Sequence, residues 1–523
     1  MQRMAQEIEL KFQIPAARRV ALRRAVATGS ATQTALQAAY FDTLGGHLAA
    51  ARIALRLRRE QGVWVQTLKA EGAGPMHRLE HNVIVPGPGR PLLDLQRHAG
   101  SQAGDRLQRL LAKAGQPALR QVYATEIQRT HRVLRSTGAR IELALDQGCI
   151  AAAGRQLPVC EIEFELLDGA PQALLALAGR WVERFGLVLD VRSKSERGHW
   201  LAAGQALPPP AAGGPGRALA RPSVPAMLAL ALGPVLAHAS AWAGEPADPA
   251  DPADSADPAD SADSAERPTP EHLHQLRVGL RRLRSLLRVF AAQAPPAATA
   301  LVPALGHLFD QLGAARDRDV MAERLWPALQ AAGAPLVALP PLLVPAGALA
   351  LLLRAPATQQ LWLALLGACQ APSVAVPPAG DGPVAEPVAE SAGFLRDSLG
   401  PPLARLLRQA QRDGLRFAAL DDPARHRLRR RIKRLRYAIE ASAALWPARR
   451  AARCLAALER AQGPLGDYHD SVVALAAYQA FAALDPQAWF AVGWLAARHD
   501  ALTPACVKAL KGLGAVRSPF VPA

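Results

Sequence analysis

The sequence of 523 residues is poor in several residue types, and each shortage argues against a class of protein. Its five cysteines are scattered without a Cys-x-x-Cys pair, which argues against a disulfide framework or a zinc site and favours a reducing, cytoplasmic location. The N-terminus lacks the apolar segment of a signal peptide. Uncharged stretches over residues 224–242 and 331–353 are broken by prolines, so we expect buried helices and loops there and no membrane span.

Acidic residues are also scarce outside one stretch of the chain. The net charge is +17, yet residues 245–266 hold eight acidic side chains and no basic ones, so the rest of the chain carries +25. This surplus predicts a polyanionic partner, which could be nucleic acid, an anionic membrane or a phosphate polymer. Half of the residues are hydrophobic and a fifth are charged, which excludes a wholly disordered chain.

Three compositional regimes divide the chain. Residues 1–206 alternate apolar and charged positions, as half-buried strands do, and residues 207–222 form a linker rich in Pro and Gly. Residues 223–523 place Ala, Leu and Arg at helical spacing. Within this half, the Asp-Pro-Ala and Asp-Ser-Ala repeats predict a disordered insertion over residues 245–266, and residues 371–390 predict a second mobile connection. The composition therefore predicts a strand-rich domain followed by a helical one.

Charged side chains alternate with apolar ones in several expected strands. In the first of them, Glu7, Glu9 and Lys11 share one face, and the apolar residues between them share the other. The alternation recurs in later segments, where the charged positions are Arg56, Arg58, Lys69, Arg78, Glu80, Glu142, Asp146, Glu161, Glu163 and Glu165. From this pattern alone, a sheet with one ordinary solvated face is an equal alternative to a charged interior.

A closed barrel would bring these charges together inside it. Unpaired charges in a packed interior are unfavourable, so something must fill such a barrel. A divalent metal and a polyphosphate would do so, because carboxylate oxygens suit Mg²⁺ or Mn²⁺ and the Arg and Lys groups complement phosphate oxygens.

Seven motifs occur along this half in a fixed order: Glu7-x-Glu9-x-Lys11, Tyr40-Phe-Asp-Thr43, Ala54-Leu-Arg-Leu-Arg58, Thr67-Leu-Lys69, Ile141-Glu-Leu-Ala-Leu-Asp146, Glu161-Ile-Glu-Phe-Glu165 and Ser193-Lys-Ser-Glu-Arg-Gly198. Together they resemble the CYTH family of triphosphate tunnel metalloenzymes over residues 5 to about 203. Within the family, the chain is most similar to bacterial inorganic triphosphatases that carry a CHAD domain downstream. The resemblance implies an α+β protein whose eight-stranded antiparallel β tunnel, with flanking helices, hydrolyses a triphosphate with Mg²⁺ or Mn²⁺.

The resemblance also implies roles for individual residues. The metal ligands would be Glu7, Glu9, Asp146, Glu163 and Glu165. The catalytic residues would be Glu7 and Glu9 together with the cations that hold phosphate oxygens, which are Lys11, Arg56, Arg58, Lys69, Arg78, Arg129, Lys194 and Arg197. Three acidic residues, Glu80, Glu142 and Glu161, would be further ligands or would orient the basic groups, and Arg132 is a weaker alternative to Arg129. Only seven of the 61 basic residues are lysines, and Lys11, Lys69 and Lys194 all fall in these motifs.

The helical half contains one basic pattern twice. The first copy forms a single stripe on a helix, beside an apolar stripe of leucines, and consists of His274, Arg277, Arg281, Arg284 and Arg288. The pattern recurs 152 positions later in His426, Arg429, Lys433 and Arg436. We expect each copy to be followed by a helix that ends in a shared signature, at residues 312–317 and 465–470. The duplication predicts two related helical bundles.

This repeated signature resembles the CHAD (conserved histidine α-helical) domain over about residues 223–515. The resemblance implies that the two basic helices face one another across a groove that binds inorganic polyphosphate, with Asp317 and Asp470 orienting the arginines. The alternative for a single basic stripe is an ordinary solvated face. Nucleic acid is disfavoured as the partner, because the five tyrosines and eleven phenylalanines do not interleave with the stripes.

The sequence therefore predicts a metal-dependent inorganic triphosphatase whose helical half docks it onto polyphosphate. One alternative is an enzyme of an organic triphosphate, either a thiamine triphosphatase or a class IV adenylate cyclase. Another is a polyphosphate-granule protein without activity. The acidic insertion would compete with polyphosphate for the basic groove, so its deletion would raise the affinity for polyphosphate.

Overall fold

A computed structural model describes residues 5–205 except 73 and 88, and residues 222–244, 268–313, 325–335, 347–370 and 392–520. Almost all of the predicted linker, the acidic insertion over 245–266, the segment 371–390 and Asp317 lie outside these residues. The described residues fall into two compact units, which we take in turn.

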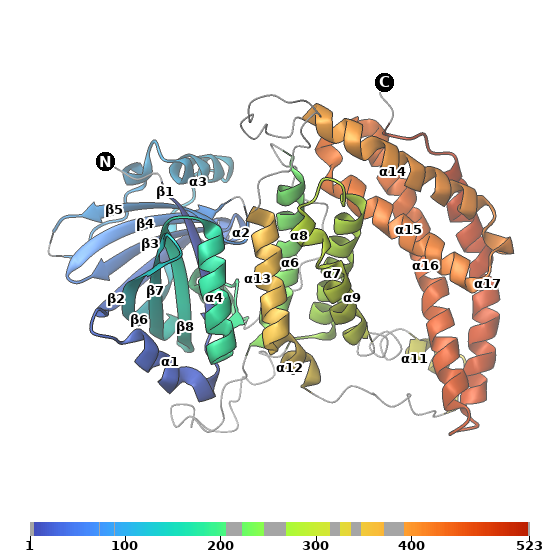
Figure 1. The fold of residues 1–523 in the computed structure, drawn as a ribbon, viewed down its shortest axis with the longest axis horizontal. Coiled ribbons are helices and arrows are strands. Elements are labelled where there is room, and N and C mark those ends of the chain that lie inside the picture. Colours follow the sequence, from blue (N-terminus) through green and yellow to red (C-terminus); the bar gives the residue numbers. More distant parts are fainter. Residues whose placement is uncertain are drawn as a thin grey trace. The chain divides into compact units, whose positions relative to one another are not determined.

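A closed β barrel forms the N-terminal part of the first unit (Figure 1). Its strands are β1 (Ala5–Gln13), β2 (Thr32–Thr43), β3 (Ile53–Glu60), β4 (Val63–Glu71), β5 (His77–Val85), β6 (Leu119–Ser136), β7 (Ala139–Ala152) and β8 (Arg155–Asp168). They pair in the order β5-β4-β3-β2-β6-β7-β8-β1, and β1 also pairs with β5 and closes the barrel. All of these pairings are antiparallel, which confirms the predicted eight-stranded antiparallel tunnel.

Local sequence explains how neighbouring strands reverse. The β3–β4 and β6–β7 hairpins turn through Gln61-Gly62 and Thr137-Gly138, in which both residues have positive φ. Such two-residue turns match the right-handed twist of the flanking strands, and glycine supplies the second position without a Cβ clash. They fix the register that keeps the charged positions of adjacent strands on one face.

The apolar positions of the strands pack outward against helices. Leu55 and Leu68 are fully buried in a cluster with Leu107 and Leu111 of α3 (Gln102–Lys113). On β8, the Phe164 ring meets Trp181 of α4 (Pro171–Phe185) edge to face at 5.7 Å. Because the outer face is buried in this way, the alternating charged positions face the interior of the barrel.

The first unit also contains chain from beyond the barrel. It comprises residues 1–212, 232–275 and 349–370. Its other helices are α1 (Arg19–Val26), α2 (His47–Ala50), α5 (Lys194–Ala202), most of α6 (Val224–Ala243), α12 (Ala348–Arg354) and α13 (Pro356–Gln370), and a two-residue strand, β9 (Val188–Leu189), pairs with β1. In Figure 1, α13 lies beside α4, and the two helices are in contact.

Helix α6 needs a separate comment, because it is apolar and 20 residues long. By length and composition alone it could cross a membrane, and the bent pair of α12 and α13 passes the same test. In the fold, however, 72% of its most apolar window is buried, as in the core helix of a soluble protein.

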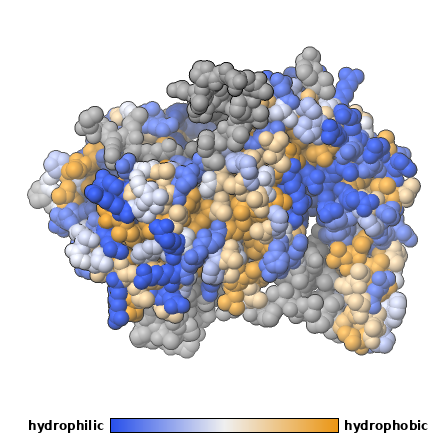
Figure 2. All heavy atoms as spheres, viewed as in Figure 1, coloured by the Kyte–Doolittle hydropathy of each residue, from blue (hydrophilic) through white to orange (hydrophobic). Residues whose placement is uncertain are grey.

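The second unit is helical throughout its described residues, as predicted. Its helices are most of α7 (Pro270–Val289), α8 (Pro296–Thr299), α9 (Val302–Gln311), α11 (Trp326–Ala331), α14 (Ala392–Leu415), α15 (Asp422–Ala441), α16 (Ala448–Phe481) and α17 (Ala488–Gly514). The predicted leucine stripe of α7 is buried, and so are Leu428, Ile432 and Leu435 at the equivalent positions of α15. Figure 2 shows hydrophilic residues gathered over α14 and α15.

One sequence expectation about this unit is wrong. The second signature, at residues 465–470, does not end its helix, because α16 continues to Phe481. The turns of α16 beyond the signature carry Ala474 and Tyr478, which are buried in a cluster with Leu495 of α17. This packing stabilises the helix past the point where the repeat suggests an end.

Candidate functional site

Charged side chains meet inside the barrel in an unbroken network of contacts and electrostatic neighbours. The network joins every charged residue assigned to the tunnel: Glu7, Glu9, Lys11, Arg56, Arg58, Lys69, Arg78, Arg129, Asp146, Glu163, Glu165, Lys194 and Arg197. The alternative of a flat sheet with a solvated face is therefore excluded by the closed geometry. The individual roles of these residues remain predictions.

A first carboxylate cluster surrounds Lys69. The Lys69 ammonium lies 2.7 Å from Glu7 Oε2 and 3.3 Å from Glu80 Oε2. Burial raises the pKa of Glu7 well above its usual value; Lys69 opposes this rise, and the nearby Glu9, Glu80 and Glu165 add to it. Burial, together with neighbouring carboxylates, also raises the pKa of Glu165 to about 7. Although burial opposes it, Lys69 and Arg56 lower the pKa of Glu80 in the same cluster to about 2, so this end of the network combines buried carboxyls of raised and of lowered pKa.

A second carboxylate cluster consists of Asp146, Glu161 and Glu163. One ligand oxygen from each lies within 4.8 Å of the others. The Lys194 ammonium contacts all three carboxylates at 2.5–2.8 Å, and the Arg129 guanidinium binds Asp146 in a bidentate pair at 2.7 and 2.6 Å. Although burial opposes it, Lys194 and Arg129 hold the pKa of Glu163 well below its usual range. This cluster is thus already balanced by cations.

Three guanidinium groups form the basic part of the interior. Arg56 Nη1 donates to the Tyr40 hydroxyl at 3.1 Å, and Arg58 pairs with Glu60 at 2.8 Å. Within the described residues, the buried Nε atoms of both arginines have no hydrogen-bond partner. Burial, followed by the charges of Arg56 and Arg129, lowers the pKa of Arg58 to about 10. An anionic oxygen placed among these groups would satisfy their donors and relieve their mutual repulsion.

The donor chemistry fits a divalent metal. All available ligands are carboxylate oxygens, which hard cations such as Mg²⁺ and Mn²⁺ prefer. Burial raises the pKa of Glu165, and a cation bound beside Glu7, Glu9 and Glu165 would stabilise their carboxylate forms. The second cluster also has the geometry for a cation, although Lys194 would have to move from between its oxygens.

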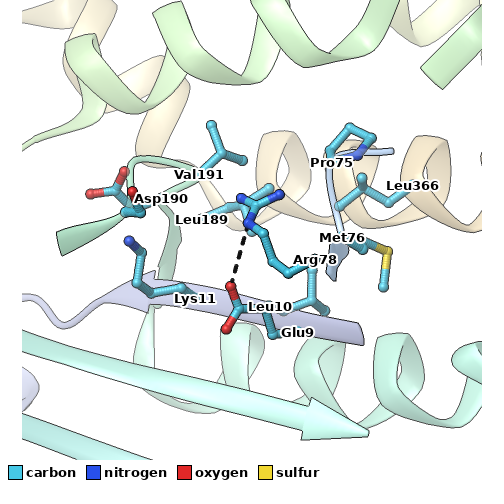
Figure 3. Close-up of a pocket in the computed structure, with 11 residues that line it drawn as sticks. Glu9, Leu10, Lys11, Pro75, Met76, Arg78, Leu189, Asp190, Val191 and Leu366 are labelled. Atoms are coloured by element: carbon cyan, nitrogen blue, oxygen red, sulfur yellow. Dashed lines mark ion pairs between the residues drawn. The ribbon is translucent and has the colours of Figure 1, made fainter. Parts of the chain in front are cut away.

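A pocket opens beside β1, at the point where its edge passes from β5 to β9 (Figure 3). Backbone bonds flank the opening: Glu9 N donates to Met76 O at 3.0 Å, and Asp190 N donates to Lys11 O at 2.9 Å. Glu9, Lys11 and Arg78 line the pocket, and Arg78 Nε lies 3.8 Å from Glu9 Oε1. Three predicted site residues therefore line a pocket at the side of the barrel.

In the second unit, an aromatic ring supports the first basic stripe. The guanidinium carbons of Arg277, Arg281 and Arg284 lie 4.3, 5.3 and 5.3 Å from the centre of the Phe309 ring on α9. Arg277 also donates to the Phe309 carbonyl at 3.0 Å. Cation–π contacts of this kind hold the arginines together without neutralising their charge.

The two basic stripes of α7 and α15 face one another within the second unit. Besides burial, the charge of Arg281 lowers the pKa of Lys433, which occupies the equivalent position of the repeat. In the same way, Arg430 lowers the pKa of Arg284, and Arg288 lowers that of Arg434. Burial, then Arg281 and Arg429, lowers the pKa of Lys433 to about 6. Within the described residues, the Lys433 amine makes no hydrogen bond or ion pair. The two helices therefore keep like charges close together.

The remaining stripe residues have different kinds of neighbour. His426 Nδ1 lies 3.2 Å from Nδ1 of His469 on α16, and Arg429 lies 3.9 Å from Asp470, the orienting partner that the sequence suggests. Arg436 contacts Glu440 at 3.3 Å. His274 lies one turn before Arg277, in the part of α7 that belongs to the first unit.

Sequence reasoning missed several residues around these sites. Tyr40 and Asp190 were not assigned roles, although Tyr40 lay inside a quoted motif. Phe309 was missed because it is separated from the stripe by a turn and a helix. Glu440 was missed as well. It occupies the position in the second copy that corresponds to Arg288 in the first, so the two copies differ in charge there, and it accepts a hydrogen bond from Arg282 at 3.0 Å. That departure from the repeat was the one available signal.

Comparison with known proteins agrees with the two halves of the structure. The CYTH domain family matches residues 5–197, and the CHAD domain family matches residues 257–479. The chain therefore contains a CYTH domain followed by a C-terminal CHAD domain.

Individual relatives cover parts of the chain. An inorganic triphosphatase of Haemophilus influenzae is 29% identical over 212 residues, which are 39% of this chain and 57% of that protein, so the match spans little more than half of the relative's length. The crystal structure of the CHAD domain from the plant Ricinus communis covers 60% of this chain and 98% of its own, with 27% identity and a TM-score of 0.42. A putative adenylyl cyclase from Hippeastrum covers 39% and 98%, with 19% identity and a TM-score of 0.28.

Proposed function

We propose that the CYTH barrel hydrolyses inorganic triphosphate with a divalent cation. The observation that carries the proposal is the closed interior in which Glu7 and Glu165, two buried carboxyls of raised pKa, belong to the same network as Arg56 and Arg58, whose Nε atoms have no hydrogen-bond partner among the described residues. A short phosphate chain with a hydrated Mg²⁺ or Mn²⁺ supplies both the anion and the cation that these groups lack. The inorganic triphosphatase from Haemophilus influenzae, which matches part of this chain, supports the same substrate class.

The cationic groups and the carboxylates of the interior have different roles. Arg56, Arg58 and Arg129 bind phosphate oxygens and stabilise the charge that develops in the transition state. Lys11 binds phosphate oxygens as a compact charge, and Lys194 holds Asp146, Glu161 and Glu163 in place around it. The carboxylates of Glu7, Glu9 and Glu165 would hold the metal, and a divalent cation bound there would supply Lewis-acid charge to the phosphate chain and to an attacking water. Positioning and charge stabilisation are the protein's main contributions, since phosphoryl transfer needs little covalent chemistry from it.

An organic triphosphate is the second candidate substrate. Stacked aromatic rings lie beside the basic groups: Tyr40 and Tyr123 are 4.5 Å apart, and the Arg56 guanidinium lies 5.9 Å from the Tyr40 ring. Both rings are nearly fully buried and packed into the barrel core, so they offer no free face to a base or thiazole. This burial favours the inorganic substrate.

We further propose that the CHAD unit binds inorganic polyphosphate across α7 and α15. Like charges held near one another, as in Arg284 with Arg430 and Arg434 with Arg288, raise the free energy of the empty basic face, and a polyanion lowers it. The described stripe residues that would contact the chain are Arg277, Arg281, Arg284, His426, Arg429, Lys433 and Arg436, with His274 at the edge. An extended phosphate polymer fits a stripe with a helical repeat better than a compact ligand does.

A substrate panel tests the enzymatic part. Purified protein should release phosphate from tripolyphosphate faster than from ATP or thiamine triphosphate, with Mg²⁺ or Mn²⁺ and not with EDTA. Glu7→Gln and Glu9→Gln should abolish release and leave polyphosphate binding intact. A higher rate on ATP or thiamine triphosphate would replace the inorganic substrate with an organic one, and no release from any of the three would refute hydrolysis.

A further inference from the structure

A short segment of the first unit, residues 188–192, runs along the part of β1 that β5 does not cover. It contacts Lys11, which is predicted to bind phosphate. Val188 and Leu189 pair with Gln13 and Phe12, and Asp190 accepts a hydrogen bond from Gln13 Nε2 at 2.6 Å. The Lys11 ammonium donates to the carbonyl oxygen of Arg192. The position of the Lys11 amine therefore depends on where residues 188–192 lie.

Two side chains from helices that follow the barrel in the sequence hold this segment. Gln359 of α13 accepts a hydrogen bond from Leu189 N at 2.8 Å through its Oε1 atom, and its Nε2 donates to Leu353 O at 2.6 Å. The Ser240 hydroxyl of α6 donates to Leu189 O and accepts from Val191 N, both at 3.2 Å. Both side chains are 2% exposed. The segment thus has its backbone bonded to β1 on one side and to these two residues on the other.

The burial makes these contacts specific. A buried amide or hydroxyl with satisfied donors and acceptors is costly to misplace, because each unpaired polar group loses its hydration without compensation. Gln359 lies within the residues matched by the CHAD family, and Ser240 lies beyond those matched by the CYTH family. The edge of the barrel is therefore completed by residues that the CYTH domain itself does not contain.

We propose that Gln359 and Ser240 are positioning residues for the tunnel, which hold residues 188–192 so that the Arg192 carbonyl fixes the Lys11 amine toward the substrate. The inference rests on the proposed triphosphatase function for its catalytic consequence. Hydrolysis would then depend on α6 and α13, through the hydrogen bonds of Ser240 and Gln359, whether or not polyphosphate is bound to the CHAD unit.

The chain offers a matched control for this proposal. The next residue, Gln360, donates from the same helix to Gly179 O at 2.9 Å and to Glu183 at 3.1 Å, both on α4. Gln360→Leu therefore removes hydrogen bonds between α13 and α4 without touching residues 188–192. Gln359→Leu and Ser240→Ala remove the proposed contacts, and having two such variants covers the case in which one does not fold.

The direct readout is the reactivity of the Lys11 amine in the full-length protein. After a pulse of acetic anhydride, peptide mass spectrometry should show Lys11 acetylated about fivefold faster in Gln359→Leu and Ser240→Ala than in wild type and Gln360→Leu, since an amine without its partner moves more freely. Exposed Lys113 on α3 serves as the internal reference. Equal Lys11 rates in all four proteins overturn the inference.

The catalytic readout separates positioning from general damage. With tripolyphosphate and Mg²⁺, the two variants should raise KM about tenfold with a smaller change in kcat, and Gln360→Leu should stay within twofold of wild type. Combined with Lys11→Ala, Gln359→Leu should add almost nothing, because both changes remove the same contact. Full additivity contradicts action through Lys11. If wild type releases no phosphate, the proposed function fails by itself, and the acetylation rates still decide whether the two residues position Lys11.

Discussion

The two charged regions of this protein handle their charges in opposite ways. Inside the barrel, Lys194 lies among three carboxylates and Arg129 binds two of them, so most charges have partners of the opposite sign. On α7 and α15, Arg284 lies near Arg430 and Arg434 lies near Arg288, so guanidinium groups lie close to groups of the same sign. A mixed interior suits a metal and an anion together, whereas a predominantly basic face suits an anion alone. Variants that change one region and leave the other intact therefore test this contrast.

The largest effect should come from removing a charge that ties the barrel network together. Glu163 contacts Arg129 at 2.6 Å and Lys194 at 2.8 Å, so Glu163→Gln leaves both cations misplaced. We expect phosphate release from tripolyphosphate to fall by about 100-fold or more, measured with Mg²⁺ at saturating substrate. Polyphosphate affinity should be unchanged.

The control is a half-buried carboxylate outside the interior network of the same barrel. Glu71 pairs with Arg52 at 2.9 Å on the surface, where ion pairs contribute little. Glu71→Gln should keep activity within twofold of wild type. A comparable loss in both variants would mean that the interior network has no special role.

A smaller effect is expected from the basic face. Replacing Arg277, Arg281, Arg429 and Lys433 by alanine should weaken polyphosphate binding about 30-fold and flatten its salt dependence, because fewer counterions are then released. Hydrolysis of tripolyphosphate should persist. Isothermal titration at several salt concentrations measures both quantities.

A variant with the same change in net charge provides the control. Arg449, Arg450, Arg453 and Arg460 are exposed on α16, outside the two stripes. If their replacement by alanine weakened polyphosphate binding equally, binding would depend on total charge and not on the facing stripes.

The pH dependence of polyphosphate binding should report Lys433. Its pKa is lowered to about 6, so the amine is largely neutral above that pH in the free protein, and a bound polyanion favours the protonated form. Binding then takes up a proton, and affinity should rise as pH falls from 8 to 6, by about tenfold beyond the change in Lys433→Arg. The arginine stays charged throughout this range. Parallel pH profiles for the two proteins would refute the assignment.

The smallest effect should come from the ring beneath the first stripe. Phe309→Leu keeps an apolar side chain and removes the cation–π contacts of Arg277, Arg281 and Arg284. We expect polyphosphate affinity to fall about threefold, with hydrolysis unchanged. A gain in affinity would show that Phe309 restrains the arginines instead of presenting them.

Some of this could be predicted from the sequence, because periodicity reports which face a residue occupies. The alternation around Glu7 and Glu163 predicted that the charged residues share one face, and the resemblance to the CYTH family implied that this face lines a tunnel. The helical spacing predicted the stripe of α7. What the sequence could not show depends on contacts between distant segments. Gln359 meets Leu189 across 170 positions, and β9 is only two residues long, so neither leaves a periodic signal.

The charge balance inside the barrel was equally beyond the sequence. Lys194 was expected to hold phosphate, and in the structure it lies among the carboxylates of Asp146, Glu161 and Glu163. Only three-dimensional proximity shows that Lys194 balances this cluster, whereas burial raises the pKa of Glu165.

An anomalous difference map from crystals of the protein grown with Mn²⁺ and tripolyphosphate is the most direct test. We predict a manganese peak inside the barrel, within coordinating distance of carboxylates from the set Glu7, Glu9 and Glu165, and phosphate density against Arg56, Arg58 and Arg129. Manganese confined to the outer surface, or an interior in which neither ion nor phosphate binds, would contradict the account.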